Sequence, residues 1–566
     1  MRPVTVMLAL ALGLGTAAPV LARDGVAGPY LAGRLASRMS DYGQAADYFT
    51  RALLSDPANP GLLENALISQ VGRGTVDKAL PLAGRLGELG LSSQIADLVI
   101  LAELARSADF KGGIAALDAG QSAGMLVDGL YRAWALVGQG QMSDAIAQFD
   151  KVADGSGTRA FGLYHKALAL ASVGDFEGAD RIFSGDENGP LRATRRGVIA
   201  HAQILSQLER NGAALELIDK TFGETGDAGF LALKSDLEAG KELSFALVST
   251  PTDGIAEVFY TVASALNGES TDVNTLAYAR MAEYLAPTQA DPLLLCASIL
   301  EAQGQYDLAT ETFNRIARED PAYIDAEMGR ADALMADGRA EAAIEVLEQL
   351  AKDNQGRADI WSALGDTLRR EERYKDAVDA YDHAISSFKG EEPGQWIVYY
   401  TRGIVNERMK NWGRAEPDFL KALELRPDHP AVLNYLGYSY LEKNINLDEA
   451  LGMIERAVAA RPDDGAIVDS LGWALYRLGR YEDAVAHLEQ AVGLLPVDPV
   501  VNDHLGDVYW AVGRKREAEF QWKRALSFEP DTEEDAARIR RKLEIGLDAV
   551  LIEEGAAPLA VTKNGN

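Results

Sequence analysis

Apolar residues in the second half of the chain recur at spacings of three and four, which is the period of an α-helix. Short stretches of similar sequence repeat within this pattern: "LGDTL" at 364–368, "LGYSY" at 436–440, "LGWAL" at 471–475 and "LGDVY" at 505–509. A second helical stretch of small and large apolar residues follows each of them. One example is Tyr481, Ala484, Leu488 and Ala491, with Pro496 after them. Each repeat therefore predicts two helices separated by a turn.

Two glycines in the stretch "LGWALYRLGRYEDA" (471–484) need an explanation, because a glycine inside a helix costs roughly 0.5–1 kcal/mol relative to alanine. We interpret Gly472 and Ala484 as the small residues at which the two helices of one repeat cross closely. Gly479 is expected in the turn, where a positive φ is useful. Pro496 is expected to end the second helix, because proline cannot continue the helical hydrogen-bond ladder.

The repeats resemble the tetratricopeptide repeat (TPR), a helix–turn–helix unit of 34 residues. Units can be laid end to end at 256–289, 290–323, 324–357, 358–391, 396–429, 430–464, 465–498 and 499–532. The chain departs from the family at Gln355 and Lys389, where the closing proline is missing, and at short insertions around Pro393 and near Asn444. The resemblance implies an all-α fold, an α-solenoid of TPR helix–turn–helix repeats.

The repeat pattern is weaker in the first half of the chain. One good unit lies at 26–59 and another near 160–188, and we expect degenerate TPR-like hairpins elsewhere up to residue 250. The stretch "STPTDG" (249–254) predicts the break between irregular and regular repeats. The predicted organisation is a signal peptide over 1–22, degenerate repeats over 23–250, a regular array over 251–532, a capping helix over 533–554 and a disordered tail over 555–566.

The capping helix is expected to cover the last repeat with a polar outer face. Thr532 and Asp535 resemble a capping box at its start. Its apolar stripe is predicted to be Ile539, Leu543 and Leu547. The basic residues Arg538, Arg540, Arg541 and Lys542 are expected to cover the rest of the helix.

The first 22 residues are typical of a secretory signal peptide. Arg2 precedes the apolar stretch "VTVMLALALGLG", and Val20 and Ala22 are the small residues that precede a cleavage site. We expect cleavage before Arg23 and a periplasmic mature protein. The alternatives to a cleaved signal peptide are an uncleaved N-terminal anchor and a wrongly assigned start, and the alternative location is the cytoplasm. No cysteine lies near the cut, so the pattern of a bacterial lipoprotein is absent.

Composition and charge exclude several classes of partner. The 85 acidic and 55 basic residues give a formal net charge of −30, which repels nucleic acid and anionic membrane surfaces. The single cysteine, Cys296, cannot form an intrachain disulfide or build a cysteine-based zinc site. No stretch after the leader approaches the length of an apolar membrane span.

Candidate enzyme chemistry is scarce. "GQSAG" (120–124) has the spelling of a nucleophile elbow around Ser122, but the preceding segment "GGIAALDA" predicts a helix and not the strand that an elbow needs. The six histidines are scattered without metal-ligand spacing: His165, His201, His383, His429, His487 and His504. Phosphate-binding and dinucleotide motifs are absent. We therefore expect no catalysis, cofactor or metal.

The TPR resemblance implies a protein-binding groove along the first helix, helix A, of successive units. Its second, fifth, ninth, twelfth and thirteenth positions tend to contact peptides in that family. The predicted groove residues are Tyr400, Asn434, Tyr438, Leu441, Asp469, Trp473, Tyr476, Arg477, Asp503, Asp507 and Trp510. Such a groove suits an extended or helical polypeptide with apolar and some basic side chains, since aromatic side chains provide large contact area. The alternative is that these aromatic residues only pack between neighbouring helices A.

The resemblance to envelope TPR adaptors, which hold a processing protease together with its substrates, extends to the C-terminal stretches "YLGYSYLEK" and "NDHLGDVYWAVGR". It implies a non-enzymatic scaffold that mediates protein–protein interactions in the bacterial cell envelope. The other hypotheses are an accessory to polysaccharide export or outer-membrane assembly, and an envelope enzyme with a site between residues 60 and 250. Repeat architecture alone does not separate them.

Overall fold

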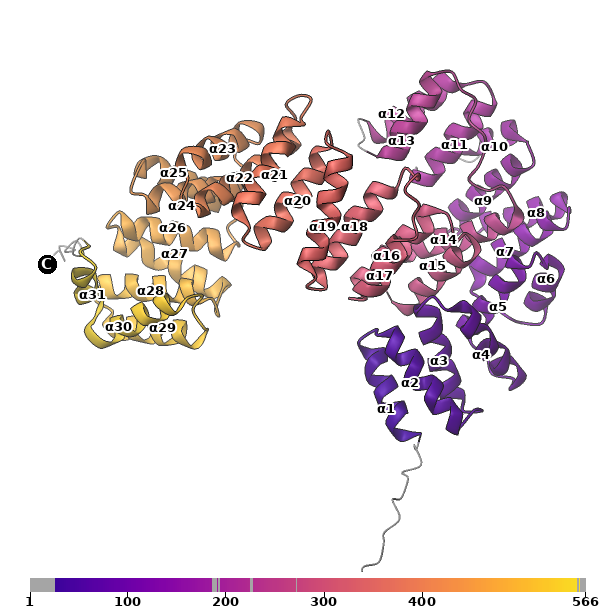
Figure 1. Ribbon diagram of the computed structural model, residues 1–566, viewed down its shortest axis with the longest axis horizontal. Helices are drawn as coiled ribbons and strands as arrows, with labels where there is room; N and C mark the ends of the chain where they lie inside the picture. The colour runs from indigo at the N-terminus through magenta and orange to yellow at the C-terminus, as the bar shows by residue number, and fades with distance from the viewer. Residues whose placement is uncertain are drawn as a thin grey trace, which may run out of the picture. The chain divides into compact units, whose positions relative to one another are not determined.

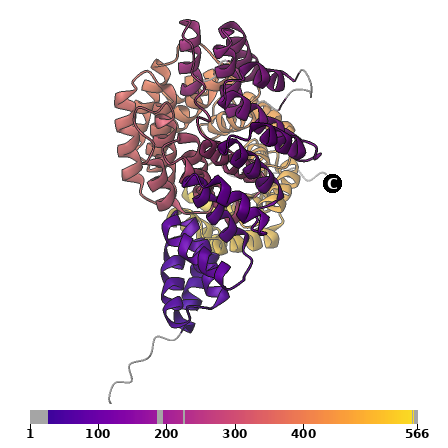
Figure 2. The same cartoon turned by 90° about the vertical axis from the view of Figure 1, so that its right-hand side faces the viewer.

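The computed structural model describes residues 26–185, 191, 194–223, 227–270, 272–556 and 559. Within these ranges every regular element is a helix, and consecutive helices pack against each other (Figures 1 and 2). The predicted all-α solenoid of helix pairs is therefore confirmed. The predicted signal peptide (1–22) lies outside the described residues, as does most of the predicted tail. None of the described helices is both long and apolar enough to span a membrane.

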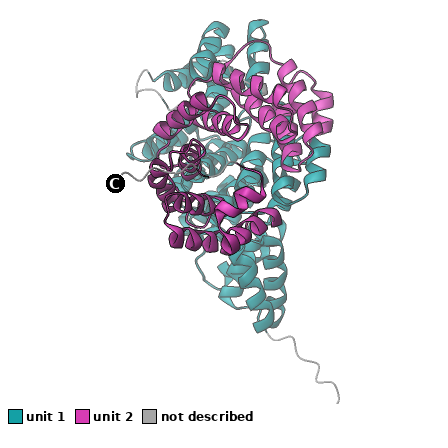
Figure 3. Ribbon diagram, turned by 90° about the vertical axis from the view of Figure 1, so that its left-hand side faces the viewer, with its two compact units in different colours: residues 1–346 teal, residues 347–566 magenta. Residues whose placement is uncertain are grey.

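The chain divides into two compact units, residues 1–346 and residues 347–566 (Figure 3). The division falls within α19 (Ala340–Asp353). The predicted change from degenerate to regular repeats near residue 250 concerns the regularity of the sequence, and its position lies inside unit 1.

Unit 1 consists of helices throughout its described residues, including the first half of the chain, where the sequence repeat is weak. Its helices before α19 are α1 (Ala27–Arg38), α2 (Tyr42–Ser55), α3 (Pro60–Gly72), α4 (Val76–Glu88), α5 (Gln94–Arg106), α6 (Phe110–Asp118), α7 (Met125–Gly138), α8 (Met142–Ala153), α9 (Arg159–Ser172), α10 (Phe176–Ser184), α11 (Arg195–Gln207), α12 (Asn211–Phe222), α13 (Ala228–Glu238), α14 (Pro251–Asn267), α15 (Val273–Leu285), α16 (Ala290–Ala302), α17 (Tyr306–Phe313) and α18 (Tyr323–Ala336).

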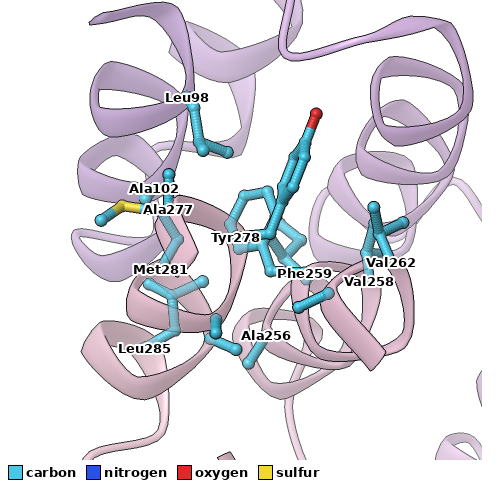
Figure 4. Packing of buried hydrophobic residues seen from close by; sticks show 14 of the residues in the cluster. Leu98, Ala102, Ala256, Val258, Phe259, Val262, Ala277, Tyr278, Met281 and Leu285 are labelled. Carbon is cyan, nitrogen blue, oxygen red and sulfur yellow. The ribbon is translucent and has the colours of Figure 1, made fainter. Parts of the chain in front are cut away.

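Unit 1 departs from a simple succession of neighbours because the chain returns on itself after α13. Helix α14 packs against α7 and α9, and α15 packs against α3 and α5. Figure 4 shows Phe259 of α14 and Tyr278 of α15 near Leu98 and Ala102 of α5. Ten of the thirteen residues of α15 are buried, so this helix is enclosed on all sides.

The start of the returning helix pair is fixed by local sequence. The segment 241–250 forms no regular element, and Thr250 then caps α14 in a reciprocal capping box with Asp253. Pro251 occupies the first turn, where its missing N–H is not needed. The predicted break at "STPTDG" is thus the point at which the chain enters the interior of unit 1.

Unit 2 follows the predicted repeat frame. Its elements after α19 are α20 (Ala358–Arg370), α21 (Tyr374–Ser386), the 3₁₀ turn η1 (Pro393–Gln395), α22 (Trp396–Arg408), α23 (Trp412–Leu425), α24 (Pro430–Glu442), α25 (Leu447–Ala460), α26 (Gly465–Arg477), α27 (Tyr481–Leu494), α28 (Pro499–Ala511), α29 (Lys515–Ser527), α30 (Glu533–Ile545) and α31 (Leu547–Glu553). Each predicted unit from 358 to 532 contains one helix pair. Even-numbered helices from α20 to α28 are the helices A.

The two glycines of the 471–484 stretch have the predicted roles. A Cβ atom on Gly472 would lie 2.5 Å from Leu488 Cγ, so only glycine allows α26 and α27 to approach this closely. Gly403 and Gly506 make the equivalent approach to Phe419 and Trp522. Gly479 lies in the turn with φ +74°.

Replacing Gly472 or Ala484 by leucine is expected to reduce the free energy of unfolding by about 1–3 kcal/mol, because both sites are filled by their neighbours. Ala484 is completely buried at the same crossing. Urea unfolding of each variant measures the loss, and hydrogen exchange should locate it in α26 and α27. The exposed position Gly493 on α27, where a Cβ meets nothing within 4 Å, is the control. Unchanged unfolding of both leucine variants would contradict the helix crossing.

The C-terminal cap differs from the expected single helix over 533–554. It is two helices, α30 and α31, separated at Gly546, whose φ is +82°. A Cβ on Gly546 would lie 2.5 Å from the Trp510 ring, so the break lets the chain pass close to that side chain. Thr532 caps α30 as predicted and accepts the backbone N–H of Asp535.

Candidate protein-binding surface

Three helices A of unit 2 form one surface because they contact each other directly. Helix α26 packs against α24 on one side and against α28 on the other. The crossing glycines allow the second helix of each repeat, helix B, to pack closely against helix A, so the helix A side chains of the three repeats face the same side. This arrangement positions the residues discussed below.

A partly open hollow of about 450 Å³ lies on this surface, a size within the usual range for ligand pockets. It is lined by Glu407, Arg408, Asn434, Tyr435, Tyr438, Ser439, Glu442, Ala466, Asp469, Ser470, Leu495, Asp498, Val500, Val501 and His504. We call it the α24–α28 hollow. Its lining comes from helices A of successive repeats and from the loop before α28.

Three predicted groove residues come together at the α24–α28 hollow: Asn434, Tyr438 and Asp469. Burial raises the pKa of Tyr438, and the nearby carboxylates of Glu442 and Asp469 raise it further. The Oδ1 atom of Asn434 is buried and has no hydrogen-bond partner among the described residues. The hollow is therefore electronegative and contains an acceptor that the chain does not use.

Asp469 is held by a histidine that the sequence analysis did not place at the site. Both carboxylate oxygens of Asp469 lie near Nδ1 of His504, at 3.1 and 2.9 Å. Burial disfavours the charged imidazole, but Asp469, with smaller contributions from Asp503 and Asp507, outweighs this effect and the pKa of His504 is raised. Since Asp469 is itself buried, the pair fixes α26 to α28 at the floor of the hollow.

Trp473 and Tyr476 are used mainly for packing. The Trp473 ring stacks on His504 with centroids 4.0 Å apart and on Tyr476 with centroids 4.7 Å apart. Trp473 Nε1 donates to Glu442 Oε1 at 3.1 Å. Arg477 donates to the same oxygen at 3.0 Å. These contacts orient Glu442 at the rim of the hollow.

Asp503 and Asp507 both form ion pairs with a side chain of the C-terminal cap, Lys542. Lys542 of α30 is buried, and its Nζ lies 2.7 Å from Asp503 Oδ2 and 2.7 Å from Asp507 Oδ1. The expectation that Lys542 covers the outer face of the cap is therefore wrong. Its ammonium group enters the repeat array because two carboxylates offset the cost of its burial.

Trp510 is also covered by the cap. Its ring packs beside Trp522 with centroids 5.4 Å apart, and its Nε1 donates to Asp548 Oδ2 at 2.8 Å. Leu441 is 1% exposed and belongs to the core. Tyr400 lies half-buried among Phe419, Tyr435 and Trp396. The packing alternative thus describes most of the predicted aromatic residues, and their role in protein binding stays a prediction.

Glu407, Glu442 and His504 line the hollow but are not among the groove residues predicted from the sequence. Glu442 is the thirteenth residue of its unit, a position that contacts peptides in the TPR family, so the resemblance contained this signal. Glu407 is the twelfth residue of the preceding unit, on helix α22, which is another of these peptide-contacting positions. His504 gave no signal, because only the folded structure brings it to Asp469.

The elbow-like motif around Ser122 lies between two helices and not between a strand and a helix. Ser122 lies in the loop between α6 and α7, and its Oγ donates to Asp128 Oδ2 at 2.5 Å. The helix predicted before "GQSAG" is present as α6. Among the described residues, no group of three or more His, Cys, Asp or Glu side chains is placed to hold a metal ion.

Comparison with known proteins supports the predicted tetratricopeptide-repeat family. Residues 300–367, 358–389 and 443–499 match family models described as tetratricopeptide repeat. A TPR repeat-containing protein of Pseudomonas aeruginosa is 34% identical over 101 residues, which are 18% of this chain and 17% of that protein. The match therefore spans about a sixth of that relative's length.

Three solved structures resemble this chain at low sequence identity. The APC/C hetero-tetramer Cut9-Hcn1 structure is 16% identical, with 92% of this chain and 96% of that chain covered and a TM-score of 0.38. A tetratricopeptide repeat protein from Parabacteroides merdae is 17% identical, with 45% and 97% covered and a TM-score of 0.37. YrrB, a TPR protein with an unusual peptide-binding site, is 20% identical, with 33% and 94% covered and a TM-score of 0.28.

Proposed function

Because this chain is a tetratricopeptide-repeat protein, we propose that it is a scaffold in the bacterial cell envelope that binds partner polypeptides at the α24–α28 hollow. The observation that carries the proposal is the hollow itself, which crosses successive helices A and retains open polar and aromatic groups. TPR folds bind protein or peptide partners, so a hollow on this face is a suitable docking site. A processing protease and its substrates are the partners that the adaptor resemblance favours.

The envelope location rests on the pattern of the first 22 residues, which lie outside the described part of the chain. In a cell fractionation, the mature protein is expected to begin at or near Arg23 and to be released with the soluble periplasmic proteins. N-terminal sequencing of that fraction is the measurement. Protein that retains Met1 and stays with the cytoplasm would contradict the proposed location.

The binding site can be tested with a photo-crosslinking residue at position 438 in living cells. Tyr438 lines the hollow, whereas Glu455 is exposed on α25 and does not line it, so position 455 is the matched control. A partner is expected to be captured from position 438 and not from position 455. A partner captured equally from both positions would place binding elsewhere.

Tyr438→Ala is expected to weaken the purified complex with the captured partner by about tenfold or more, since truncation of an aromatic anchor typically costs at least 1–2 kcal/mol. The loss should be seen mainly in the dissociation rate. Surface plasmon resonance measures it, with Glu455→Ala as the control. Each variant must keep the melting transition of the parent, because Tyr438 also contacts neighbouring helices. Equal affinity of a folded Tyr438→Ala variant would exclude the hollow as the docking site.

A further inference from the structure

The lining of the α24–α28 hollow combines negative charge with an apolar wall. It contains four carboxylates, those of Glu407, Glu442, Asp469 and Asp498, and one arginine, Arg408. The apolar part comes from Leu495, Val500 and Val501 beside the start of α28. We propose that the hollow receives a lysine or arginine side chain next to an aliphatic side chain of the partner's polypeptide, an inference that rests on the proposed docking at this hollow.

The electrostatics of the hollow favour a cation. Tyr438 stands between Glu442 and Asp469, and both carboxylates disfavour ionisation of its hydroxyl group. Asp469 already faces His504, and Glu442 already accepts Trp473 and Arg477. Glu407 accepts the Tyr435 hydroxyl at 3.4 Å and lies 3.9 Å from Lys443 Nζ. Asp498 Oδ1 caps α28 by accepting the N–H groups of Val500 and Val501. The oxygens left for a ligand are therefore Oδ2 of Asp498 and Oε2 of Glu442, and Glu407 adds negative charge beside them. The Tyr438 ring adds a surface on which a cation is attracted.

The unused acceptor at Asn434 favours a ligand that brings N–H donors. Its Oδ1 atom has no partner in the described chain, and a buried acceptor without a donor is unfavourable because it has lost its hydrogen bonds to water. An ammonium or guanidinium group that enters beside Asn434 recovers this hydrogen bond. A carboxylate or a purely apolar side chain does not.

The chain itself binds a lysine between two carboxylates of helix α28, one repeat after Asp469. Asn434, Asp469 and Asp503 are the fifth residues of consecutive units, and Asp503 together with Asp507 holds the buried Lys542 ammonium group. The Trp522 ring lies 5.8 Å from Lys542 Nζ. The fifth position of a helix A, with a carboxylate and an aromatic ring nearby, therefore accommodates a lysine in unit 2.

The apolar edge of the hollow favours a polypeptide over a small free cation. Leu494, Val497 and Val500 are 38%, 66% and 46% exposed on the segment that connects α27 with α28. Three exposed aliphatic side chains in seven residues beside an acidic hollow offer contact area to a neighbouring aliphatic side chain. A polyamine or free arginine would leave them uncovered.

The test uses the full chain and short fluorescein-labelled peptides of glycine and serine. Each peptide carries a leucine two residues before a variable position, which is lysine, arginine, norleucine, glutamine or glutamate. Fluorescence anisotropy is expected to give about tenfold or tighter binding for lysine and arginine than for norleucine, which has the length of lysine without its charge. Replacing the leucine by serine should weaken the lysine peptide about threefold or more.

The charge preference must depend on the hollow, because the whole chain is acidic. The variant Glu407→Gln with Glu442→Gln is expected to reduce the preference for lysine over norleucine to less than about threefold, and the control Glu455→Gln is expected to keep it. Circular dichroism establishes that the double variant is folded. The inference is overturned if norleucine or glutamate peptides bind as well as lysine, if the double variant keeps the preference, or if no peptide binds. A partner crosslinked at position 438 would then still support the proposed docking site with another ligand chemistry.

Discussion

Replacement of Lys542 by methionine is expected to lower the stability of the C-terminal end of unit 2 by about 3–5 kcal/mol, the usual cost of breaking a buried ion pair from one side. The Lys542 side chain is 0% exposed, and it is the cation that lies closest to the buried carboxylate of Asp507 and to the carboxylate of Asp503, whose side chain is 16% exposed. Methionine fills a similar volume, so the loss comes from the charge. Urea unfolding measures it, and hydrogen exchange should locate it in α28 and α30.

This loss should depend on pH. Burial raises the pKa of Asp507, Lys542 lowers it only in part, and Asp503 raises it further. A carboxyl group with a raised folded-state pKa stabilises the fold below its unfolded pKa and loses that contribution as the pH rises through the folded pKa. Without Lys542 the pKa rises again, so the variant should approach the parent as the pH is lowered from 7 towards 5. A stability difference that is constant over this range would argue against unpaired carboxylates as the cause.

Two further variants distinguish the loss of the buried charge from a general effect of mutating the cap helix α30. Arg540→Met changes an exposed residue of the same helix, which pairs with Glu533 on the surface, and is expected to have a much smaller effect. Adding Asp503→Asn and Asp507→Asn to Lys542→Met should recover most of the stability, since no buried charge remains. Trp522 Nε1 can still donate to the amide oxygen at position 507. A Lys542→Met variant as stable as the parent would mean that α30 does not insert this side chain.

The repeat frame of unit 2 was predictable because it depends on local rules. The crossing of α26 and α27 needs a small residue at Gly472, and the turn needs a positive φ at Gly479, so each leaves a mark in the sequence. The same marks recur at each unit of about 34 residues. Helix boundaries and the pairing of helices A and B therefore follow from the sequence.

The occupation of the predicted groove was not predictable, because it depends on contacts between distant residues. Lys542 has the sequence environment of a solvated cap, with Arg540 and Arg541 directly before it, and only the folded chain places it between Asp503 and Asp507. His504 and Asp469 lie 35 residues apart and meet only when α26 and α28 pack. These contacts close the C-terminal end of the groove and leave the α24–α28 hollow as its open part.

The return of α14 and α15 in unit 1 was likewise hidden from the repeat pattern. Residues 256–289 match a regular unit, which predicts packing against the next repeat. One sequence feature indicated that α15 is not an ordinary repeat helix: its apolar residues are not confined to one face. In the structure its polar and apolar faces are both buried. Charged residues such as Arg280 and Glu283 conceal this, because they are buried as an ion pair.

A second buried network should control how firmly this returning helix pair is held. Arg196→Met is expected to destabilise unit 1 by about 3–5 kcal/mol, because the substitution leaves Glu257 buried without its cation. The side chains of Arg196 and Glu257 are 7% and 1% exposed, and Arg196 Nη2 lies 2.5 Å from Glu257 Oε2. Arg196 on α11 also pairs with Asp291 on α16, so it joins three helices that are distant in sequence. Urea unfolding measures the total loss.

The pattern of compensation distinguishes a lost ion pair from a general packing defect. Arg196→Met combined with Glu257→Met should recover much of the stability, because two apolar side chains then replace the pair. Asp291 remains paired in this variant, since Arg195 Nη1 lies 3.0 Å from its Oδ1 atom. The control is Arg210→Met, which removes an arginine that is 43% exposed and pairs with Glu177 and Asp180. In Arg196→Met, hydrogen exchange should accelerate in α14 and α15 before it does in α1 and α2. Faster exchange throughout unit 1, with no recovery in the double variant, would mean that Arg196 acts through packing and that the ion pair does not hold α14 in place.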